Sequence, residues 1–310
     1  MEYFNALKNL TRIIIPAFSV VFLIIIFTSC DKFQGDQTVP AYLSIDSISF
    51  VTDNDLQGTD NQKIADVWVY VDDDVIGGFE LPALIPVLAE GIHKLEIRPG
   101  IILNGIPETR APNPCWEPII TYSFNFVPDS ISKTTGTSTY TSNSVFVWME
   151  DFEDASLAIK KSNNSDTGIV RTQPANAPDA FLDEYSFFSG ISYLDKERPY
   201  LQLVSDDGND AGFVFDRGDF IFLELNYKND VPLTIGLYIK LMDNTVEDRS
   251  FLNISPSDDW NKIYINFTPI VNETVDAVYY NVYINASLDS ETDQARIMLD
   301  NIKLVTRPNL

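Results

Sequence analysis

The second half of the chain consists of short segments in which apolar and polar residues alternate, separated by turns rich in Asp, Asn and Gly. Alternation with a period of two places every second side chain on one face, as in a half-buried β-strand. Residues 233–242 show the pattern most clearly, with Ile235 and Leu237 on the expected core face. No stretch of this half has a convincing helical period. Many short strands at this spacing predict an all-β sandwich or jelly roll.

The first half also alternates, notably at residues 41–51, and a Ser/Thr-rich stretch separates the two halves. Such a stretch, with little apolar content, is typical of a linker or of a long exposed hairpin end. We predict an all-β fold, with a small N-terminal β-sandwich followed by a C-terminal jelly-roll β-sandwich. The expected divisions are a signal peptide at 1–30, a tether at 31–40, a small β-domain at 41–130, a linker at 131–144 and a jelly roll at 145–308.

Near its beginning the chain carries an uncharged apolar run, residues 13–30, preceded by Lys8 and Arg12. A basic region, an apolar region and a small-residue end form the layout of a secretory signal. A membrane-spanning helix at residues 11–29 is the alternative, because that length is enough to cross a bilayer. Pro16 within the run, and the polar residues directly after it, favour cleavage.

The end of this run, Phe27-Thr28-Ser29-Cys30, resembles a bacterial lipobox. The resemblance implies that Cys30 becomes the first residue of the mature protein and carries its lipid, palmitate included. Each buried methylene contributes about 0.8 kcal/mol, so an anchor of several acyl chains is stable. The implied location is the outer membrane, on its periplasmic or cell-surface face.

Charge and rare residues exclude several classes of function. The formal net charge is −24, and such a field repels nucleic acid and anionic lipid headgroups. Once Cys30 is lipidated, Cys115 is the one cysteine left, so no intrachain disulfide can form. His93 is the single histidine, which excludes a zinc site built from Cys and His ligands. A Ser-His-Asp triad would have to use that same histidine.

Residues 67–101 contain a series of short motifs: Val69 to Asp72, Gly77-Gly78, Leu81-Pro82, Gly91-Ile92-His93 and Pro99-Gly100. Together these motifs resemble the small β-domains called PEGA-like, which implies the architecture of a surface protein and no activity. His93 is interpreted as a structural residue at the start of a strand. The acidic run Asp72–Asp74 is interpreted as a hairpin turn, because a calcium loop needs more oxygen ligands at alternate positions.

Three segments of the second half form a further pattern, at residues 150–153, 260–265 and 295–305. They resemble the first, a central and the last strand of galactose-binding-like jelly rolls, a fold shared by many carbohydrate-binding modules. The resemblance implies a structural calcium held by Glu153 and Asp300, with Glu150 or Asp151 as further ligands. Calcium prefers such carboxylate oxygens. The alternative is that these are edge-strand carboxylates in solvent.

A sugar site needs flat aromatic faces beside amides or carboxylates that form hydrogen bonds with hydroxyl groups. Residues 278–286 place aromatic and amide side chains on one side of a predicted strand. The predicted ligand-binding residues are Tyr279, Asn281 and Tyr283, with Tyr238 and Tyr264 on neighbouring strands. The alternative is purely structural, because aromatic residues are also good strand formers.

These observations predict a lipid-anchored, non-catalytic binding protein of the cell envelope, with polysaccharide as its ligand. Its expected partners are the membrane, through the lipid, and polysaccharide, but not nucleic acid. The alternative is a structural or assembly subunit of an outer-membrane transport, secretion or gliding complex that binds other proteins. No enzyme is expected, because no spacing among the 45 Asp and Glu residues singles out a pair of catalytic carboxylates.

Overall fold

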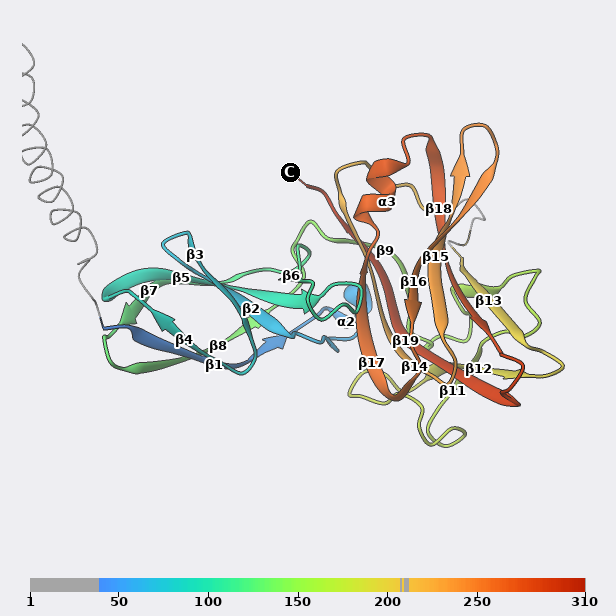
Figure 1. Ribbon diagram of the computed structural model, residues 1–310, viewed down its shortest axis with the longest axis horizontal. Helices are drawn as coiled ribbons and strands as arrows, with labels where there is room; N and C mark the ends of the chain where they lie inside the picture. Colours follow the sequence, from blue (N-terminus) through green and yellow to red (C-terminus); the bar gives the residue numbers. More distant parts are fainter. Residues whose placement is uncertain (1–38, 207, 209–211, 310) are drawn as a thin grey trace, which may run out of the picture.

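The computed structural model describes residues 39–206, 208 and 212–309. The predicted signal peptide, the lipid attachment site at Cys30 and most of the tether lie outside the described residues. Two β-domains lie side by side, a small domain (residues 39–138) and a larger jelly roll (residues 145–309) (Figure 1). Within the described ranges, no helix is long and apolar enough to cross a membrane.

The small domain is a sandwich of two β-sheets. Its elements are β1 (Ala41–Phe50), α2 (Asn54–Gln57), β2 (Asp66–Val71), β3 (Asp74–Glu80), β4 (Ala83–Val87), β5 (Gly91–Ile102), β6 (Arg110–Pro112), β7 (Ile119–Phe126) and β8 (Ile131–Ser138). One sheet has the order β4-β1-β8, and the other has the order β3-β2-β5-β6 with β7 paired to β5. Leu43 and Ile45 of one sheet share a buried core with Val67 and Val69 of the other.

The predicted linker at 131–144 is wrong over most of its length. Residues 131–138 form β8, which pairs in parallel with β1, and Tyr42 lies opposite Ile131. Thr and Ile are β-branched and suit a strand, and pairing with β1 satisfies the backbone groups of this polar segment. The small domain therefore closes at Ser138, and only the segment from Thr139 to Ser144 connects the two domains.

The acidic run after β2 is a tight turn, as predicted. Asp72 and Asp73 both have positive φ, 50° and 71°, which suits the twist of a two-residue hairpin. His93 Nδ1 lies 2.6 Å from Asp72 Oδ2. This hydrogen bond lowers the pKa of Asp72 and raises that of His93. His93 thus ties a hairpin turn to the start of β5, which agrees with a structural role.

The jelly roll is the larger sandwich. Its elements are β9 (Val145–Glu150), β10 (Ile159–Lys161), β11 (Val170–Thr172), β12 (Ser189–Asp195), β13 (Tyr200–Ser205), β14 (Phe220–Asn229), β15 (Leu233–Leu241), β16 (Val246–Ile254), β17 (Ser257–Asn266), α3 (Thr268–Glu273), β18 (Ala277–Ser287) and β19 (Gln294–Arg307). A six-stranded sheet has the order β11-β12-β19-β14-β17, with β9 also paired to β19. A five-stranded sheet has the order β10-β13-β18-β15-β16. The predicted all-β fold class is confirmed.

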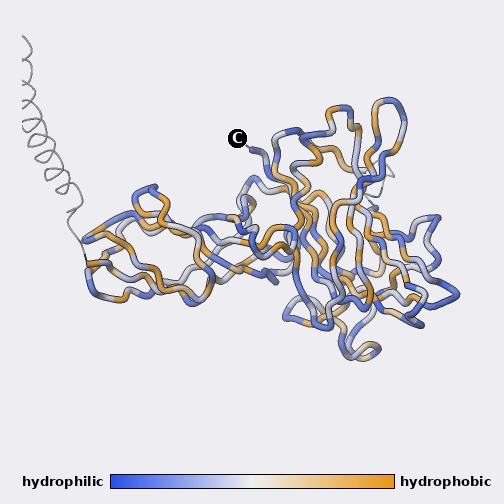
Figure 2. The backbone as a smooth tube through the Cα atoms, in the orientation of Figure 1, coloured by the Kyte–Doolittle hydropathy of each residue, from blue (hydrophilic) through white to orange (hydrophobic). Residues whose placement is uncertain are grey.

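One hydrophobic core fills the space between these two sheets. Ile235 and Leu237 of β15 lie in it, as predicted, together with Leu223 of β14 and Leu299 of β19. Hydrophobic and hydrophilic residues alternate along many of these strands in Figure 2. Each sheet therefore has an inner apolar face and an outer face that is free to carry other chemistry.

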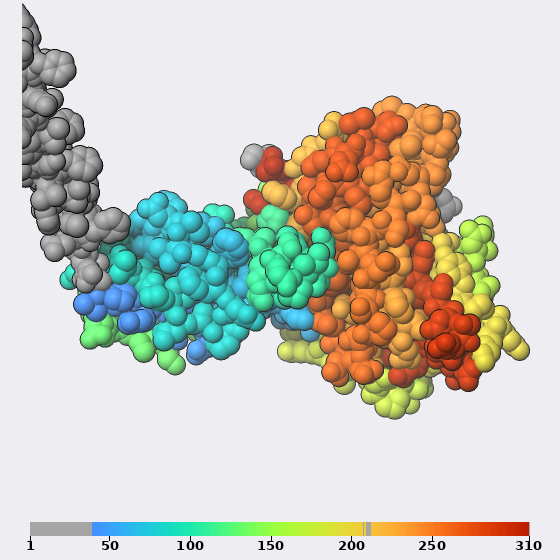
Figure 3. Space-filling model, viewed as in Figure 1, coloured from blue at the N-terminus to red at the C-terminus, as the bar shows by residue number. Residues whose placement is uncertain are grey.

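The small domain covers part of the outer face of the six-stranded sheet, over β14, β17 and β19, and Figure 3 shows the two domains in direct contact along one side of the jelly roll. Phe50, Trp116 and Tyr140 form a buried cluster with Phe222 and Tyr264 of the jelly roll. The rings of Trp116 and Tyr264 pack edge to face, 5.5 Å apart. The outer face of the five-stranded sheet lies on the far side of the sandwich, and the small domain as described does not reach it.

We expect Trp116→Ala to lower the free energy of unfolding by about 3–5 kcal/mol, because a large buried ring is lost from the contact between the domains. Urea unfolding followed by circular dichroism measures this. The wild-type protein should unfold in one transition, because both domains share this cluster. Phe187→Ala, at a ring that is 55% exposed, is the control and should change stability little. Two separate wild-type transitions would contradict the shared cluster.

Candidate functional site

The outer face of the five-stranded sheet carries aromatic and amide side chains from three neighbouring strands. We call it the tyrosine face, and its residues are Tyr200 and Gln202 of β13, Tyr238 of β15, and Tyr279, Asn281, Tyr283 and Asn285 of β18. The strand register brings them together. Asn281 lies opposite Tyr238, and Asn285 lies opposite Gln202. Their neighbours in sequence, Val282 and Ile284, point into the core.

A glycine sets the packing of the two central tyrosines. Tyr283 lies opposite Gly236 of β15, and a Cβ atom on that glycine would come within 2.4 Å of the Tyr283 ring. Because Gly236 has no side chain, the Tyr283 ring can lie flat across the neighbouring strand. There it packs against Tyr238, with 4.7 Å between ring centroids. Tyr238 is half-buried, and its ring is backed by Tyr283, which is only 2% exposed.

A hydrogen-bond network orients the tyrosine hydroxyls. Gln202 Nε2 donates to Tyr238 Oη at 2.7 Å and to Tyr200 Oη at 2.9 Å. The Ser162 hydroxyl donates to Gln202 Oε1 and fixes the orientation of that amide. Both tyrosine hydroxyls accept from Gln202, so each keeps its own proton for donation to another group.

The hydroxyl groups of Tyr238 and Tyr283 keep their protons, which a hydrogen-bond donor needs. Burial, with the nearby Asp248 carboxylate as a smaller cause, raises the pKa of Tyr238 to about 12. Burial and a hydrogen bond to Asp248 also raise the pKa of Tyr283. Both hydroxyls therefore remain protonated at neutral pH. The face offers hydroxyl donors, amide groups and partly exposed rings, which suit a neutral hydroxylated ligand.

The structure brings together four of the five predicted ligand-binding residues. Tyr279, Asn281 and Tyr238 are half-buried on this face, and Tyr283 supports them from below as a buried ring. Tyr264 is elsewhere, because β17 belongs to the other sheet. Sequence reasoning missed Gln202 and Tyr200, since nothing local reveals that β13 pairs with β18.

Tyr264 takes part in a buried polar layer between the two domains. Its hydroxyl donates to Gln62 Oε1 at 2.8 Å and accepts from the backbone N–H of Lys63 at 2.8 Å. Beside it, Tyr140 Oη donates to Glu224 Oε2 at 2.8 Å, and Glu224 is completely buried. Buried polar groups are costly unless they are hydrogen-bonded, so these pairs specify how the domains meet.

Two buried lysines belong to the same layer. Lys303 Nζ donates to the backbone oxygen of Thr59 at 2.6 Å, and Lys262 Nζ lies 3.3 Å from Asn226 Oδ1. Burial lowers the pKa of Lys303 to about 7, with further lowering by the charge of Lys262. The negative charge of Glu224, with those of other acidic groups, raises the pKa of Lys303 and partly offsets this lowering.

The predicted calcium ligands both hold the segment before β12. Glu153 Oε1 accepts from the backbone N–H groups of Phe187 and Phe188, at 2.6 and 2.8 Å. Asp300 Oδ2 accepts from the Ser186 hydroxyl at 2.7 Å, and burial raises its pKa. No group of three or more His, Cys, Asp or Glu side chains that could hold a metal ion occurs in the described part of the chain. These carboxylates act here as hydrogen-bond acceptors, and calcium binding stays a prediction.

No protein-family model matches the sequence, and none of the curated proteins is similar to it. Among solved structures, the CBM22-1 xylan-binding domain of Paenibacillus barcinonensis Xyn10C aligns with a TM-score of 0.39 and 10% identity, over 55% of this chain and 99% of that one. A carbohydrate-binding module of the β-sandwich superfamily aligns at 0.37 and 16%, over 79% and 86%. The K2 cleaved adhesin domain of Lys-gingipain aligns at 0.34 and 11%, over 53% and 98%. Likenesses this weak carry no argument about a ligand.

We expect Gly236→Ala to lower the free energy of unfolding by about 1–3 kcal/mol, because the new methyl group overlaps the Tyr283 ring and a backbone oxygen. Chemical unfolding measures the loss. Gly168→Ala is the matched control, since its Cβ would meet only ordinary contacts at 3.5 Å or more. Equal stability of the two variants would show that Tyr283 does not need the space above Gly236.

We expect the stability of the wild-type protein to rise with pH between about 7 and 10, relative to Lys303→Met. In that window the unfolded chain binds a proton at Lys303 that the folded chain does not, so raising the pH favours folding. The free energy of unfolding of Lys303→Met minus that of the wild type should fall by about 2–3 kcal/mol from pH 6 to pH 9. Unfolding curves at several pH values measure this, and a constant difference would place the lysine in a more polar environment.

Proposed function

We propose that this chain is a non-catalytic polysaccharide-binding protein that a lipid on Cys30 holds in the cell envelope. The observation that supports the binding role is the tyrosine face. It is the one outer face of the jelly roll that the small domain leaves open, and it combines aromatic rings with amides. The proposal for the lipid rests on the sequence around Cys30 alone.

The chemistry of the tyrosine face suits sugar rings. A pyranose ring presents apolar C–H groups on its faces and hydroxyl groups around its edge. The rings of Tyr238 and Tyr279 supply partly exposed apolar surface. Asn281 supplies an amide opposite Tyr238, and Asn285 supplies a second amide farther along β18, opposite Gln202. A few placed polar groups on an aromatic surface are a common basis for ligand specificity.

The direction of the chain fits an anchored protein. β1 begins at the end of the small domain that lies farthest from the jelly roll (Figure 1). A lipid on Cys30 would thus attach at that far end, through the short segment of residues 31–38. The small domain would act as a spacer, and the buried polar layer would hold the jelly roll at a fixed angle to it. The tyrosine face would then remain accessible to polymers outside the membrane.

We expect Tyr238→Ala to weaken polysaccharide binding about tenfold or more, because stacking area and a hydroxyl donor are lost together. Isothermal titration of the full-length protein against a panel of soluble polysaccharides, with and without calcium, measures the affinity. Tyr122→Ala is the matched control, because Tyr122 is 75% exposed on β7 of the small domain. Binding that survives Tyr238→Ala unchanged would exclude this face. A wild-type protein that binds no polysaccharide would exclude the proposed function.

A further inference from the structure

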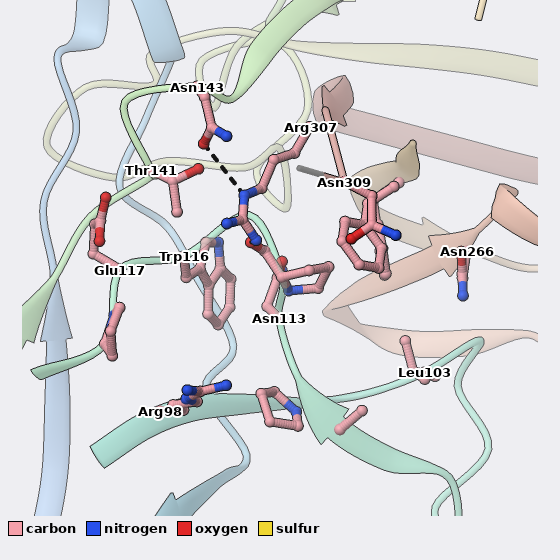
Figure 4. A pocket seen from close by; sticks show the side chains of 16 residues that line it. Arg98, Leu103, Asn113, Trp116, Glu117, Thr141, Asn143, Asn266, Arg307 and Asn309 are labelled. Carbon is pink, nitrogen blue, oxygen red and sulfur yellow. Dashed lines mark hydrogen bonds between the residues drawn. The ribbon is translucent and has the colours of Figure 1, made fainter. Parts of the chain in front are cut away.

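A second cavity lies between the two domains, away from the tyrosine face. Its volume is about 600 Å³, which is large enough for one or two sugar units. Its walls come from β5, β6 and the loop after β6, the connecting segment, and the ends of β14, β17 and β19 (Figure 4). We call it the interdomain pocket. None of its residues belongs to the tyrosine face, so this site is independent of the function proposed above.

The interdomain pocket is lined by a guanidinium held in place from two sides. Arg307 Nε donates to Asn143 Oδ1 at 3.2 Å, and Arg307 Nη1 donates to the backbone oxygen of Pro114 at 2.6 Å. These two bonds fix the plane of the group. Nη2 makes no hydrogen bond within the described structure, so its two protons can serve a ligand. A pre-oriented guanidinium favours planar anions such as carboxylates.

Two further donors on the pocket walls have no acceptor. Asn113 Oδ1 accepts from the backbone N–H of Cys115 at 2.9 Å, which fixes the amide and leaves Nδ2 without a partner. Trp116 Nε1 is also without a partner. Both residues are at least 96% buried. In Figure 4 the Trp116 indole nitrogen lies toward the guanidinium of Arg307. Neighbouring groups that can only donate favour a ligand that accepts.

The charge of the lining is opposite to that of the whole protein. Arg98 is a second cation in the pocket, with its Nε donating to Glu96 Oε1 at 2.6 Å, and Glu117 is the one acidic residue among the described lining residues. The chain as a whole carries a formal net charge of −24. A cationic pocket in so acidic a protein therefore provides local attraction for a small anion, whereas the surrounding surface repels it.

The remaining lining groups suit hydroxyls rather than further charge. Thr141, Asn266 and Asn309 line the same cavity, and their side chains can both donate and accept. Phe220 and Pro112 provide apolar surface beside them. We propose that the interdomain pocket binds a hydroxylated carboxylate of sugar size, that is, a uronic acid or a short glycan that contains one. Its carboxylate would be held by Arg307 with the donors of Asn113 and Trp116.

Isothermal titration of the full-length protein with D-glucuronate and D-galacturonate tests this proposal, with D-glucose and D-galactose as neutral counterparts. We expect the uronates to bind and the neutral sugars to bind at least tenfold more weakly. Arg307→Gln should weaken uronate binding roughly ten- to a hundredfold, because a charged hydrogen-bond donor is lost. Arg98→Gln should weaken it as well.

Glu117→Gln separates a direct role from a loss of folding. Glu117 and a bound uronate are both negative, so removal of the Glu117 charge should strengthen uronate binding about twofold or more. Damage to the domain interface would weaken binding instead. Thermal unfolding should show that all variants are folded, and Tyr238→Ala should leave uronate binding unchanged. The proposal is overturned if neither uronate binds at millimolar concentration, if Arg307→Gln binds as well as wild type, or if sulfate binds as tightly as the uronates.

Discussion

The organisation of this protein depends on the burial of a polar surface between two β-sandwiches. The outer face of the six-stranded sheet carries Glu224, Lys262 and Lys303, all at most 7% exposed. Such groups are costly to bury unless each finds partners. Thr59 accepts from Lys303 and Tyr140 donates to Glu224, whereas Lys262 donates to Asn226 of its own sheet. Hydrophobic contact alone would tolerate many relative orientations of the domains, whereas these hydrogen bonds and the Trp116 cluster favour one.

This arrangement divides the jelly roll into a covered side and an open side. The tyrosine face could carry binding residues because no domain packs on it, and Tyr264 could not join it because it lies under the small domain. The closed interface is also incomplete at one edge, where the interdomain pocket remains. Arg307 and Trp116 thus have two roles. They contribute to the interface between the domains, and they line a cavity with hydrogen-bond donors.

The two candidate sites differ in chemistry because their surroundings differ. On the tyrosine face, Gln202 orients tyrosine hydroxyls that stay protonated, and the amides are neutral, so long uncharged ligands are suited. In the interdomain pocket, Arg307 and Arg98 line a cavity of about 600 Å³, beside two buried donors without partners in the described structure, so a small anion is suited. A chain built this way could contact both the neutral and the acidic units of a mixed polysaccharide.

The sequence alone determined the fold class and most strands, because alternation with a period of two is local. Residues 233–242, the clearest alternating segment, form β15 (Leu233–Leu241), whereas β8 was mistaken for a linker because its strand pairing with β1 leaves no trace in a Ser/Thr-rich segment. The tertiary structure alone decided which tyrosines share a face. Tyr279 and Tyr238 meet through the register of β15 and β18, while Tyr264 is buried by a second domain. Such pairings join residues far apart in the chain, so their energies depend on the assembled sheets and not on neighbouring residues.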